Sequence, residues 1–264
     1  MHKPNILIID ALNLIRRIYA VEEKHTQDPK ALIIACKARV HNACARLLKL
    51  KRFQYAVAIF DGRNSWRYQY YPKYKFSRAP MPEILKANLQ HVASGFELAG
   101  IAVYYPENDE ADDVIATLSN KVTQVNLDST IVSTDKGFLP LLTQTVSIYD
   151  YFQQCFIEEA QVEKKFSLNT LQLIDFFALV GDKTNDIPGV KGIGKQTALT
   201  LLAQHGSVDN AVTAETLESK VTQKLQSGID DFILSKALLT LRTDIDLGIS
   251  LRDLRISTSL VAES

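Results

Sequence analysis

Short, continuous apolar runs recur along the N-terminal part of the chain, and three of them end in an aspartate. Residues 5–10 (NILIID), 54–61 (QYAVAIFD) and 129–135 (STIVSTD) share this pattern. A strand that is apolar along its whole length is buried on both faces, which is typical of a parallel sheet covered by helices. The segments between these runs have helical spacing, so the sequence predicts an α/β fold with a central, mostly parallel sheet.

The strand pattern stops near residue 160. Two further runs, 101–105 and 146–150, complete the predicted sheet, which places an α/β core at residues 1–160. Residues 161–250 show only helical patterns, and the tail at 251–264 has no clear pattern. The helices predicted in this second part are approximately 169–180, 194–205, 208–225 and 229–241.

Composition excludes several classes of function. The 30 basic and 30 acidic residues balance, so any binding of nucleic acid must come from local patches. The five histidines are scattered and the three cysteines form no CxxC pair, which argues against zinc and favours reduced thiols in a cytoplasm. No apolar stretch approaches the roughly 20 residues of a membrane span, so we expect no membrane association.

Acidic residues cluster at positions that a parallel sheet brings together. Three strand-end aspartates would meet at the carboxyl edge of the sheet, where ligands bind, and the run NDEADD (108–113) opens a helix beside them. Carboxylates without histidine or cysteine select Mg²⁺, Mn²⁺ or Ca²⁺, and two such ions can support phosphoryl chemistry. Taken singly, each acid is also a good helix cap. The candidate metal ligands are Asp10, Asp61, Glu110, Asp112, Asp113, Asp135 and Asp182.

A glycine-rich stretch, GVKGIGKQT (189–197), lies between two predicted helices. It differs from a P-loop because Gln196 follows Lys195 and no strand precedes it, so we expect no nucleotide cofactor. A helix–hairpin–helix explains it better: the second helix would present its N-terminal N–H groups and Lys195 to a phosphate of a DNA backbone. A plain turn with glycine caps is the alternative.

Basic and aromatic residues alternate in segment 62–82. Arginine and lysine follow phosphates while tyrosine and tryptophan stack on bases, a combination that suits single-stranded nucleic acid. Arg67 is one of the basic residues placed among tyrosines here. The alternative is a surface loop whose aromatic rings pack against the sheet.

Together these motifs resemble the bacterial flap endonucleases, or 5′-nucleases, including the 5′-nuclease domain of bacterial DNA polymerase I. The resemblance runs from about residue 5 to about residue 245. It implies a PIN-like 5′-nuclease core, a helical arch at about 62–90 and a C-terminal helix–three-turn–helix that grips DNA. The motifs that carry it are IIDALNLIRR, AIFDG, YKFSRAPMP, NDEADD, IVSTDKGF and LVGDKTNDIPGVKGIGKQTA.

The resemblance also implies roles for individual residues. The seven acids above match the metal cluster of the family, while Tyr74, Lys75 and Arg78 match arch residues that stack on the substrate or hold its phosphate. A K⁺ site built from backbone carbonyls matches Leu179, Val180, Pro188, Val190 and Ile193. The residues expected to contact DNA are Arg67, Gly192, Ile193, Gly194, Lys195, Gln196 and Thr197.

Two departures from the family pattern fall on its second metal position. Many members read DKD where this chain has Asp135, Lys136 and Gly137, and GDSSDN where it has GDKTND (181–186). Gly137 therefore replaces one acid, and Asn185 stands where another would be. The resemblance implies a complete first metal position and a second one that is only partly depleted, because Asp182 remains.

The predicted function is that of a Mg²⁺-dependent, structure-specific endonuclease that cuts 5′-flap DNA or a single-strand/duplex junction, with K⁺ at its hairpin, acting as a monomer. Two alternatives stay open at this point. One is a branched-DNA binding protein whose metal site is too depleted for catalysis. The other is a ribonuclease of the PIN type, against which the helical second part of the chain argues.

Overall fold

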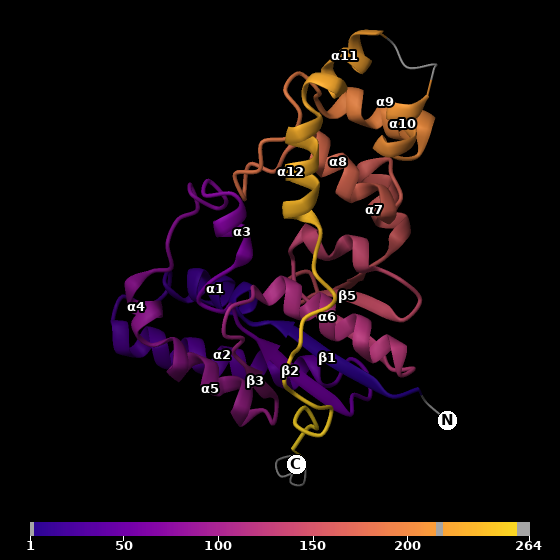
Figure 1. Cartoon of the computed structure of the whole chain (residues 1–264). Helices are drawn as coiled ribbons and strands as arrows, with labels where there is room; N and C mark the ends of the chain where they lie inside the picture. Colours follow the sequence, from indigo (N-terminus) through magenta and orange to yellow (C-terminus); the bar gives the residue numbers. More distant parts are fainter. Residues whose placement is uncertain (1–2, 215–218, 258–264) are drawn as a thin grey trace.

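The computed structural model describes residues 3–214 and 219–257. Its centre is a six-stranded sheet in the order β3-β2-β1-β4-β5-β6, in which the first five strands are parallel and β6 is antiparallel (Figure 1). The buried strands β1, β2 and β4 are those with the most continuous apolar runs, as expected for a sheet covered on both faces. The strands are β1 (Asn5–Asp10), β2 (Tyr55–Ile59), β3 (Ala102–Tyr104), β4 (Asp128–Val132), β5 (Val146–Asp150) and β6 (Cys155–Ile157).

Helices cover both faces of the sheet. One face packs against α1 (Ala11–Glu22), α2 (Pro29–Leu47) and α5 (Leu89–Leu98), and the other packs against α6 (Ala111–Gln124) and the 3₁₀ helix η1 (Lys136–Leu141). Alternate residues of β1 divide between these two cores, since successive side chains of a strand point to opposite faces. Because β1 to β5 are parallel, their carboxyl ends all lie at the same edge of the sheet.

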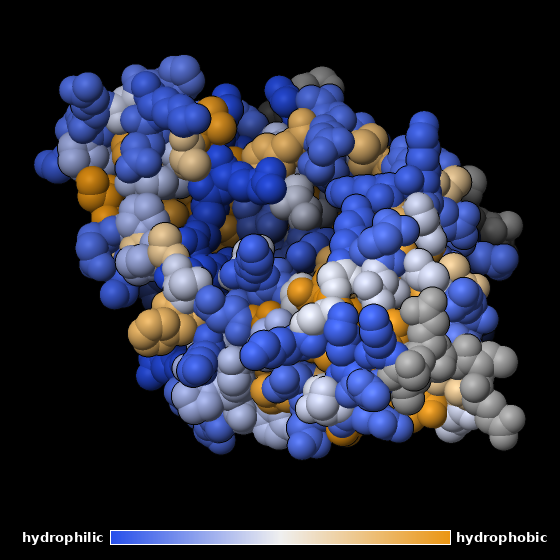
Figure 2. All heavy atoms as spheres, turned by 90° about the horizontal axis from the view of Figure 1, so that it is seen from above, coloured by the Kyte–Doolittle hydropathy of each residue, from blue (hydrophilic) through white to orange (hydrophobic). Residues whose placement is uncertain are grey.

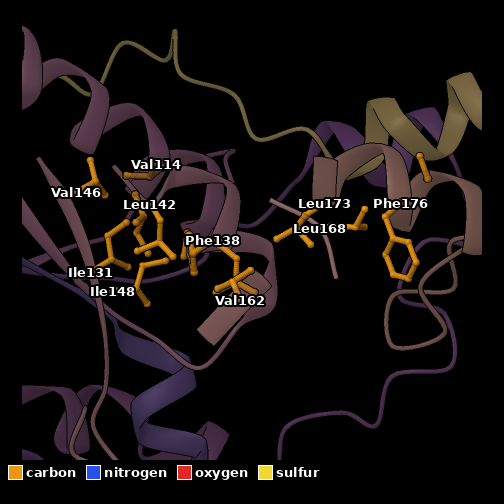
Figure 3. Close-up of a cluster of buried hydrophobic side chains, with 14 of the residues drawn as sticks. Val114, Ile131, Phe138, Leu142, Val146, Ile148, Val162, Leu168, Leu173 and Phe176 are labelled. Carbon is orange, nitrogen blue, oxygen red and sulfur yellow. The ribbon is translucent and has the colours of Figure 1, made fainter. Parts of the chain in front are cut away.

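The C-terminal part is a group of helices above the carboxyl edge of the sheet (Figure 1). Its apolar core continues that of the sheet: Phe138 and Ile148 pack in the same cluster as Leu173 and Phe176 of the helical part (Figure 3). The helical part is thus held beside the site edge of the sheet. Its elements are α7 (Glu159–Phe166), η2 (Thr170–Gln172), α8 (Leu173–Val180), α9 (Lys195–His205), α10 (Val208–Thr213), α11 (Ser219–Ser227) and α12 (Ile229–Leu239).

The chain after α12 returns along the sheet to its amino end. The Ala56 N–H donates to the Leu254 carbonyl at 2.9 Å, and the Ser257 N–H donates to the Gly100 carbonyl at 3.3 Å. The hydroxyl of Tyr104 donates to the Leu247 carbonyl at 2.7 Å. The sequence offered no pattern here because an extended segment held by backbone hydrogen bonds needs no particular side chains.

The predicted α/β fold with an all-helical second part is confirmed, with differences in detail. Strand β6 and helix α7 were not predicted, because β6 has three residues and its hairpin turn lacks the glycine of common tight turns. The helix predicted at 208–225 contains α10 and the start of α11, and residues 215–218 between them lie outside the described part. Segment 62–90 contains only two five-residue helices, α3 (Trp66–Tyr70) and α4 (Glu83–Ala87).

No helix in the described ranges is long and apolar enough to cross a membrane.

Candidate metal and nucleic-acid site

Four of the predicted acids line one cleft at the carboxyl edge of the sheet. Asp10 ends β1, Asp61 follows β2, Asp112 lies in the first turn of α6, and Asp135 follows β4. The cleft has a volume of about 200 Å³. Its basic wall consists of Arg16, Arg17, Lys75 and Arg78.

Each strand-end aspartate is oriented by a local hydrogen bond. Asp10 caps α1 by accepting from the Asn13 N–H at 3.2 Å, and its second oxygen accepts from the Ser133 hydroxyl at 2.8 Å. Asp61 accepts from the Ala111 N–H at 2.8 Å. Asp135 caps η1 through the Gly137 N–H, also at 2.8 Å. These acids can therefore both cap helices and form one cluster, because the capping hydrogen bonds hold the carboxylates in the cleft.

Burial makes the negative charge of this cluster costly. Burial raises the pKa of Asp10 from 3.8 to about 7, with a smaller upward contribution from the charges of Asp61 and Asp135. Burial likewise raises the pKa of Asp112 well above its ordinary value, and the carboxylate of Asp135 adds to the shift. Buried carboxylates in mutual repulsion favour either a proton or a cation.

The donor set of this cleft fits a divalent cation that keeps part of its water shell. Within residues 3–214 and 219–257, no three acidic, histidine or cysteine side chains stand close enough to enclose a metal ion by themselves. Mg²⁺ does not require such a cage: it typically keeps several waters and is bound by one or two carboxylates together with substrate phosphates. Asp112 has no hydrogen-bond partner among the described residues, so both of its oxygens are available.

Two of the predicted metal ligands, Glu110 and Asp113, face a buried arginine. Arg67 is 1% exposed, and its Nη1 lies 2.8 Å from Glu110 and 2.7 Å from Asp113. Its Nη2 donates to the second Asp113 oxygen at 2.8 Å. Asp113 also accepts from the Trp66 Nε1–H and from the backbone N–H of Arg242. Asp113 is absent from the cleft lining, so it supports the start of α6 from behind.

The burial of Arg67 contradicts its predicted contact with DNA. Its remaining donors are used within the protein: Nε donates to the Leu238 carbonyl at 2.8 Å and Nη2 to the Thr240 carbonyl at 3.2 Å. Five guanidinium hydrogen bonds thus join α3, α6 and the end of α12. The alternation of basic and aromatic residues in segment 62–82 does not distinguish a buried arginine from one that binds DNA.

Tyr74 is also buried, which argues against its predicted stacking on a substrate. It is 5% exposed and packs with Ile187 and Leu238 of the helical part. Burial raises the pKa of its hydroxyl. The aromatic side chains of segment 62–82 that remain exposed are Tyr68, Tyr70 and Phe76.

Lys75 and Arg78 do lie at the cleft, as predicted. The Lys75 Nζ donates to Glu110 at 2.6 Å. Although burial disfavours the charged form, the carboxylates of Asp112 and Glu110 raise the pKa of Lys75, while Lys75 and Arg67 outweigh burial to lower that of Glu110. Lys75 therefore stays cationic next to the aspartates, and Glu110 serves as its partner rather than lining the cleft.

The second predicted metal position is occupied by protein contacts. Asp182 is 3% exposed and pairs with Lys136 at 3.1 Å, outside the cleft lining. Asp186 is turned away to segment 62–82, where it accepts from the backbone N–H and the hydroxyl of Ser77, both at 2.8 Å. At Gly137, an added Cβ would meet an Asp135 oxygen at 3.2 Å. Asp182 thus does not line the cleft, and its charge is balanced by Lys136, the residue that follows Asp135.

The glycine-rich stretch forms a tight hairpin between α8 and α9. Gly181 and Gly189 have positive φ and approach so closely that a Cβ on Gly189 would lie 2.3 Å from the Gly181 nitrogen. Helix α9 begins at Lys195 without a side-chain cap, so its first N–H groups are available to an anion. Gly192, Gly194, Lys195 and Gln196 are exposed, whereas Ile193 is buried.

The five residues predicted to bind K⁺ through carbonyls lie in or beside this hairpin. The Leu179 carbonyl accepts from the Val190 N–H at 2.8 Å, and the Val190 carbonyl accepts from the Ile193 N–H at 3.0 Å. Val180 ends α8, and Pro188 lies next to Gly181. Each accepting carbonyl keeps a second lone pair.

Several cleft residues were not predicted as site residues. Asn13, Arg16 and Arg17 line the cleft from α1, within the motif IIDALNLIRR. Ser133 orients Asp10 from the end of β4. The helical spacing of Arg16 to Asn13 beside a strand-end aspartate was the available signal.

Seen from above, the molecule is hollowed between two lobes, and the surface there is mainly hydrophilic (Figure 2).

Comparisons with known proteins agree with this arrangement. Residues 5–167 match a family model described as the 5′-3′ exonuclease N-terminal resolvase-like domain, and residues 168–260 match the 5′-3′ exonuclease C-terminal SAM fold. A flap endonuclease Xni of Pseudoalteromonas translucida is 49% identical over 97% of this chain and 100% of that relative. One from Psychromonas ingrahamii is 43% identical over 96% of this chain and 98% of that relative.

Solved structures show the same fold at low sequence identity. T5 5′-exonuclease with bound zinc superposes with a TM-score of 0.75 at 20% identity, covering 90% of each chain. A T5 D15 flap endonuclease variant in complex with DNA and metal ions gives a TM-score of 0.72 at 21% identity, covering 89% of this chain and 88% of that one.

Proposed function

Because the chain belongs to the Xni-type flap endonucleases of the 5′-3′ exonuclease family, we propose that it uses Mg²⁺ to cut DNA at the base of 5′ flaps. The chain is a structure-specific nuclease of phosphodiester bonds that binds DNA and depends on divalent metal. The finer assignments are Mg²⁺ with Mn²⁺ as a substitute, K⁺ at the hairpin, and action as a cytoplasmic monomer. We place the division between nuclease core and DNA-holding part near residue 160.

The observation that carries this proposal is one cleft that is lined by both aspartates and basic side chains. Asp10, Asp61, Asp112 and Asp135 are the residues that would hold the cation. When bound, a divalent cation supplies charge neutralisation and an activated water for phosphoryl transfer. The match to a family whose second domain is helical also removes the PIN-type ribonuclease alternative.

The basic residues of the cleft act on the substrate phosphate. Lys75 is fixed by Glu110 at 2.6 Å and kept charged, so its ammonium is preorganised toward an anion entering beside Asp112. Arg78 is exposed at the same cleft and is free to follow a phosphate. Preorganised cations of this kind stabilise charge that develops in the transition state.

The helical part positions the DNA. The open start of α9 with Lys195 offers N–H groups and a positive charge to the phosphate backbone without reading bases. Buried hydrogen bonds from Arg67 join this part to α6. The duplex grip and the cleft are therefore held in one arrangement.

The test is cleavage of a labelled 5′-flap DNA, comparing the wild type with Asp112→Asn in Mg²⁺, Mn²⁺ and Ca²⁺. We expect cleavage at the flap base with Mg²⁺ that Asp112→Asn slows by about 10²–10³, while both proteins bind the DNA in Ca²⁺. A blunt duplex is the control substrate.

A second candidate function rests on the second metal position. Asp182 pairs with Lys136, Asp186 pairs with Ser77, and Gly137 carries no side chain. If the wild type binds flap DNA but cleaves it in neither Mg²⁺ nor Mn²⁺, the chain is a branched-DNA binding protein that keeps the nuclease fold.

A further inference from the structure

A second cavity, of about 290 Å³, lies beside the catalytic cleft. It is formed by the end of α1, one face of α2 and the turn between β5 and β6. Ile18 and Val21 make its apolar wall, and Tyr151 and Phe152 contribute two rings packed edge to face at 5.3 Å. None of the roles described above uses this cavity.

The cavity and the cleft are neighbours, and one contact links their walls. Arg17 lines the cleft, and its guanidinium carbon lies 5.3 Å from the centre of the Phe152 ring, which lines the cavity. Arg17 and Val21 are four residues apart on α1, about 6 Å along the helix axis. That distance corresponds to about two nucleotides of a stacked strand.

The opposite wall of the cavity is basic. Arg39, Asn42 and Arg46 are spaced by three and four residues, so they lie on one face of α2. Arg39 is held by Glu22 at 3.0 Å. Arg46 is exposed and has no ion-pair partner within the described part of the chain. The wall thus offers a positive charge and an amide to an anionic ligand.

We propose that this cavity is a nucleotide subsite, which holds one nucleotide of the DNA strand next to the part of that strand that lies in the cleft. The base packs on Tyr151 and Phe152, since base–aromatic stacking tolerates any base. The phosphate faces Arg46 and Asn42. This inference rests on the proposed nuclease function, because it is the cleft that brings the strand to the cavity.

The experiment lengthens flap substrates one nucleotide at a time on each side of the scissile bond. In the wild type we expect one added nucleotide to lower KM by about 5- to 20-fold, in line with a stacked base, with kcat unchanged. An abasic site at that position should remove the gain. We call this drop in KM on adding one nucleotide the step. Arg46→Ala and Tyr151→Leu should remove the step, and Arg46→Ala should lower the salt slope of binding by about one.

Arg52→Ala is the matched control. Arg52 is an exposed arginine just before β2, at the amino end of the sheet, so its removal changes net charge equally. It should preserve the step. If the step persists unchanged in Arg46→Ala and Tyr151→Leu, or if no added nucleotide produces one, the subsite does not exist.

The DNA affinity of the same series of flap substrates is also measured in Ca²⁺. If the wild type fails to cleave but its binding still shows a step that Arg46→Ala removes, the proposed cleavage activity fails and the subsite stands. If the wild type cleaves at the flap base and the step ignores Arg46, the subsite fails and the nuclease function stands.

Discussion

Arg67 and Asp113 form a buried bidentate ion pair, with Nη1 2.7 Å and Nη2 2.8 Å from the two carboxylate oxygens. The pair joins α3 to the first turn of α6, next to Asp112 in the sequence. It uses both Asp113 oxygens, so this acid orients the helix that carries a cleft residue. A planar guanidinium suits this geometry, whereas a lysine could satisfy only part of it.

Arg67→Met should destabilise the protein by about 3–5 kcal/mol, because Glu110 and Asp113 would remain buried without a cation. Urea unfolding followed by circular dichroism measures the change. The control is Arg242→Met, whose pairs with Asp109 and Asp244 lie at the surface and should contribute less than about 1 kcal/mol. A double variant, Arg67→Met with Asp113→Leu, should recover part of the loss. Equal effects of the two single variants would contradict the role given to Arg67.

Asp112→Asn should lower kcat by about 10²–10³ and yet raise the melting temperature in the absence of divalent cations. Loss of a metal-holding carboxylate removes several kcal/mol of transition-state stabilisation. The same substitution relieves a buried charge whose pKa is raised by burial and by Asp135. Steady-state cleavage and thermal unfolding in EDTA measure the two effects. A lower melting temperature in EDTA would show that Asp112 is not under electrostatic strain.

The metal-free protein should be less stable at pH 8 than at pH 5.5. The pKa of Asp10 rises from 3.8 to about 7 on folding, because of burial, so the folded state binds this proton more tightly. The free energy of unfolding therefore falls as pH rises from about 4 to about 7, by at most about 4 kcal/mol.

Asp10→Asn should flatten this pH dependence, and excess Mg²⁺ should offset it above pH 7, where the cation replaces the proton. Melting temperatures across pH 5.5–8, with EDTA and with Mg²⁺, test both statements. Stability that rises with pH in EDTA would contradict the expected direction.

If Lys195 contacts the DNA backbone at the open end of α9 as proposed, Lys195→Ala should weaken the binding of duplex and flap DNA alike and lower the salt slope by about one. Fluorescence anisotropy in Ca²⁺ at several salt concentrations gives both values. The control variant for Lys195→Ala is Lys191→Ala, which removes another exposed lysine of the same hairpin. A loss that depends on DNA sequence would contradict backbone recognition.

The sheet and its site edge could be predicted because each depends on local patterns. Strand-end acids such as Asp10 and Asp135 are readable since continuous apolar runs mark the strands and parallel topology brings their ends together. The cleft positions of Lys75 and Arg78 came from resemblance rather than from spacing.

The errors concern side chains whose direction is decided by tertiary packing. Arg67 and Tyr74 lie in a segment without a helical or strand period, so no pattern indicates which side chains turn inward. Glu110 is the N-cap of α6 and Asp113 lies one residue after Asp112 in its first turn, and helical geometry separates successive side chains by about 100°. Only the position of the arginine behind α6 shows which of these acids enters the cleft.

The return of the chain along the sheet has a consequence for biosynthesis. The carbonyls of Leu238 and Thr240 hold Arg67, and Leu254 and Ser257 pair with Ala56 and Gly100 in the α/β part of the chain. Residues 238–257 follow the sheet in the chain, so the ribosome makes them after it. Until they emerge, the guanidinium of Arg67 behind the first turn of α6 lacks two of its five hydrogen-bond acceptors. We therefore expect a nascent chain that stops before residue 238 to hold the start of α6, with Asp112, less firmly than a chain that contains these residues.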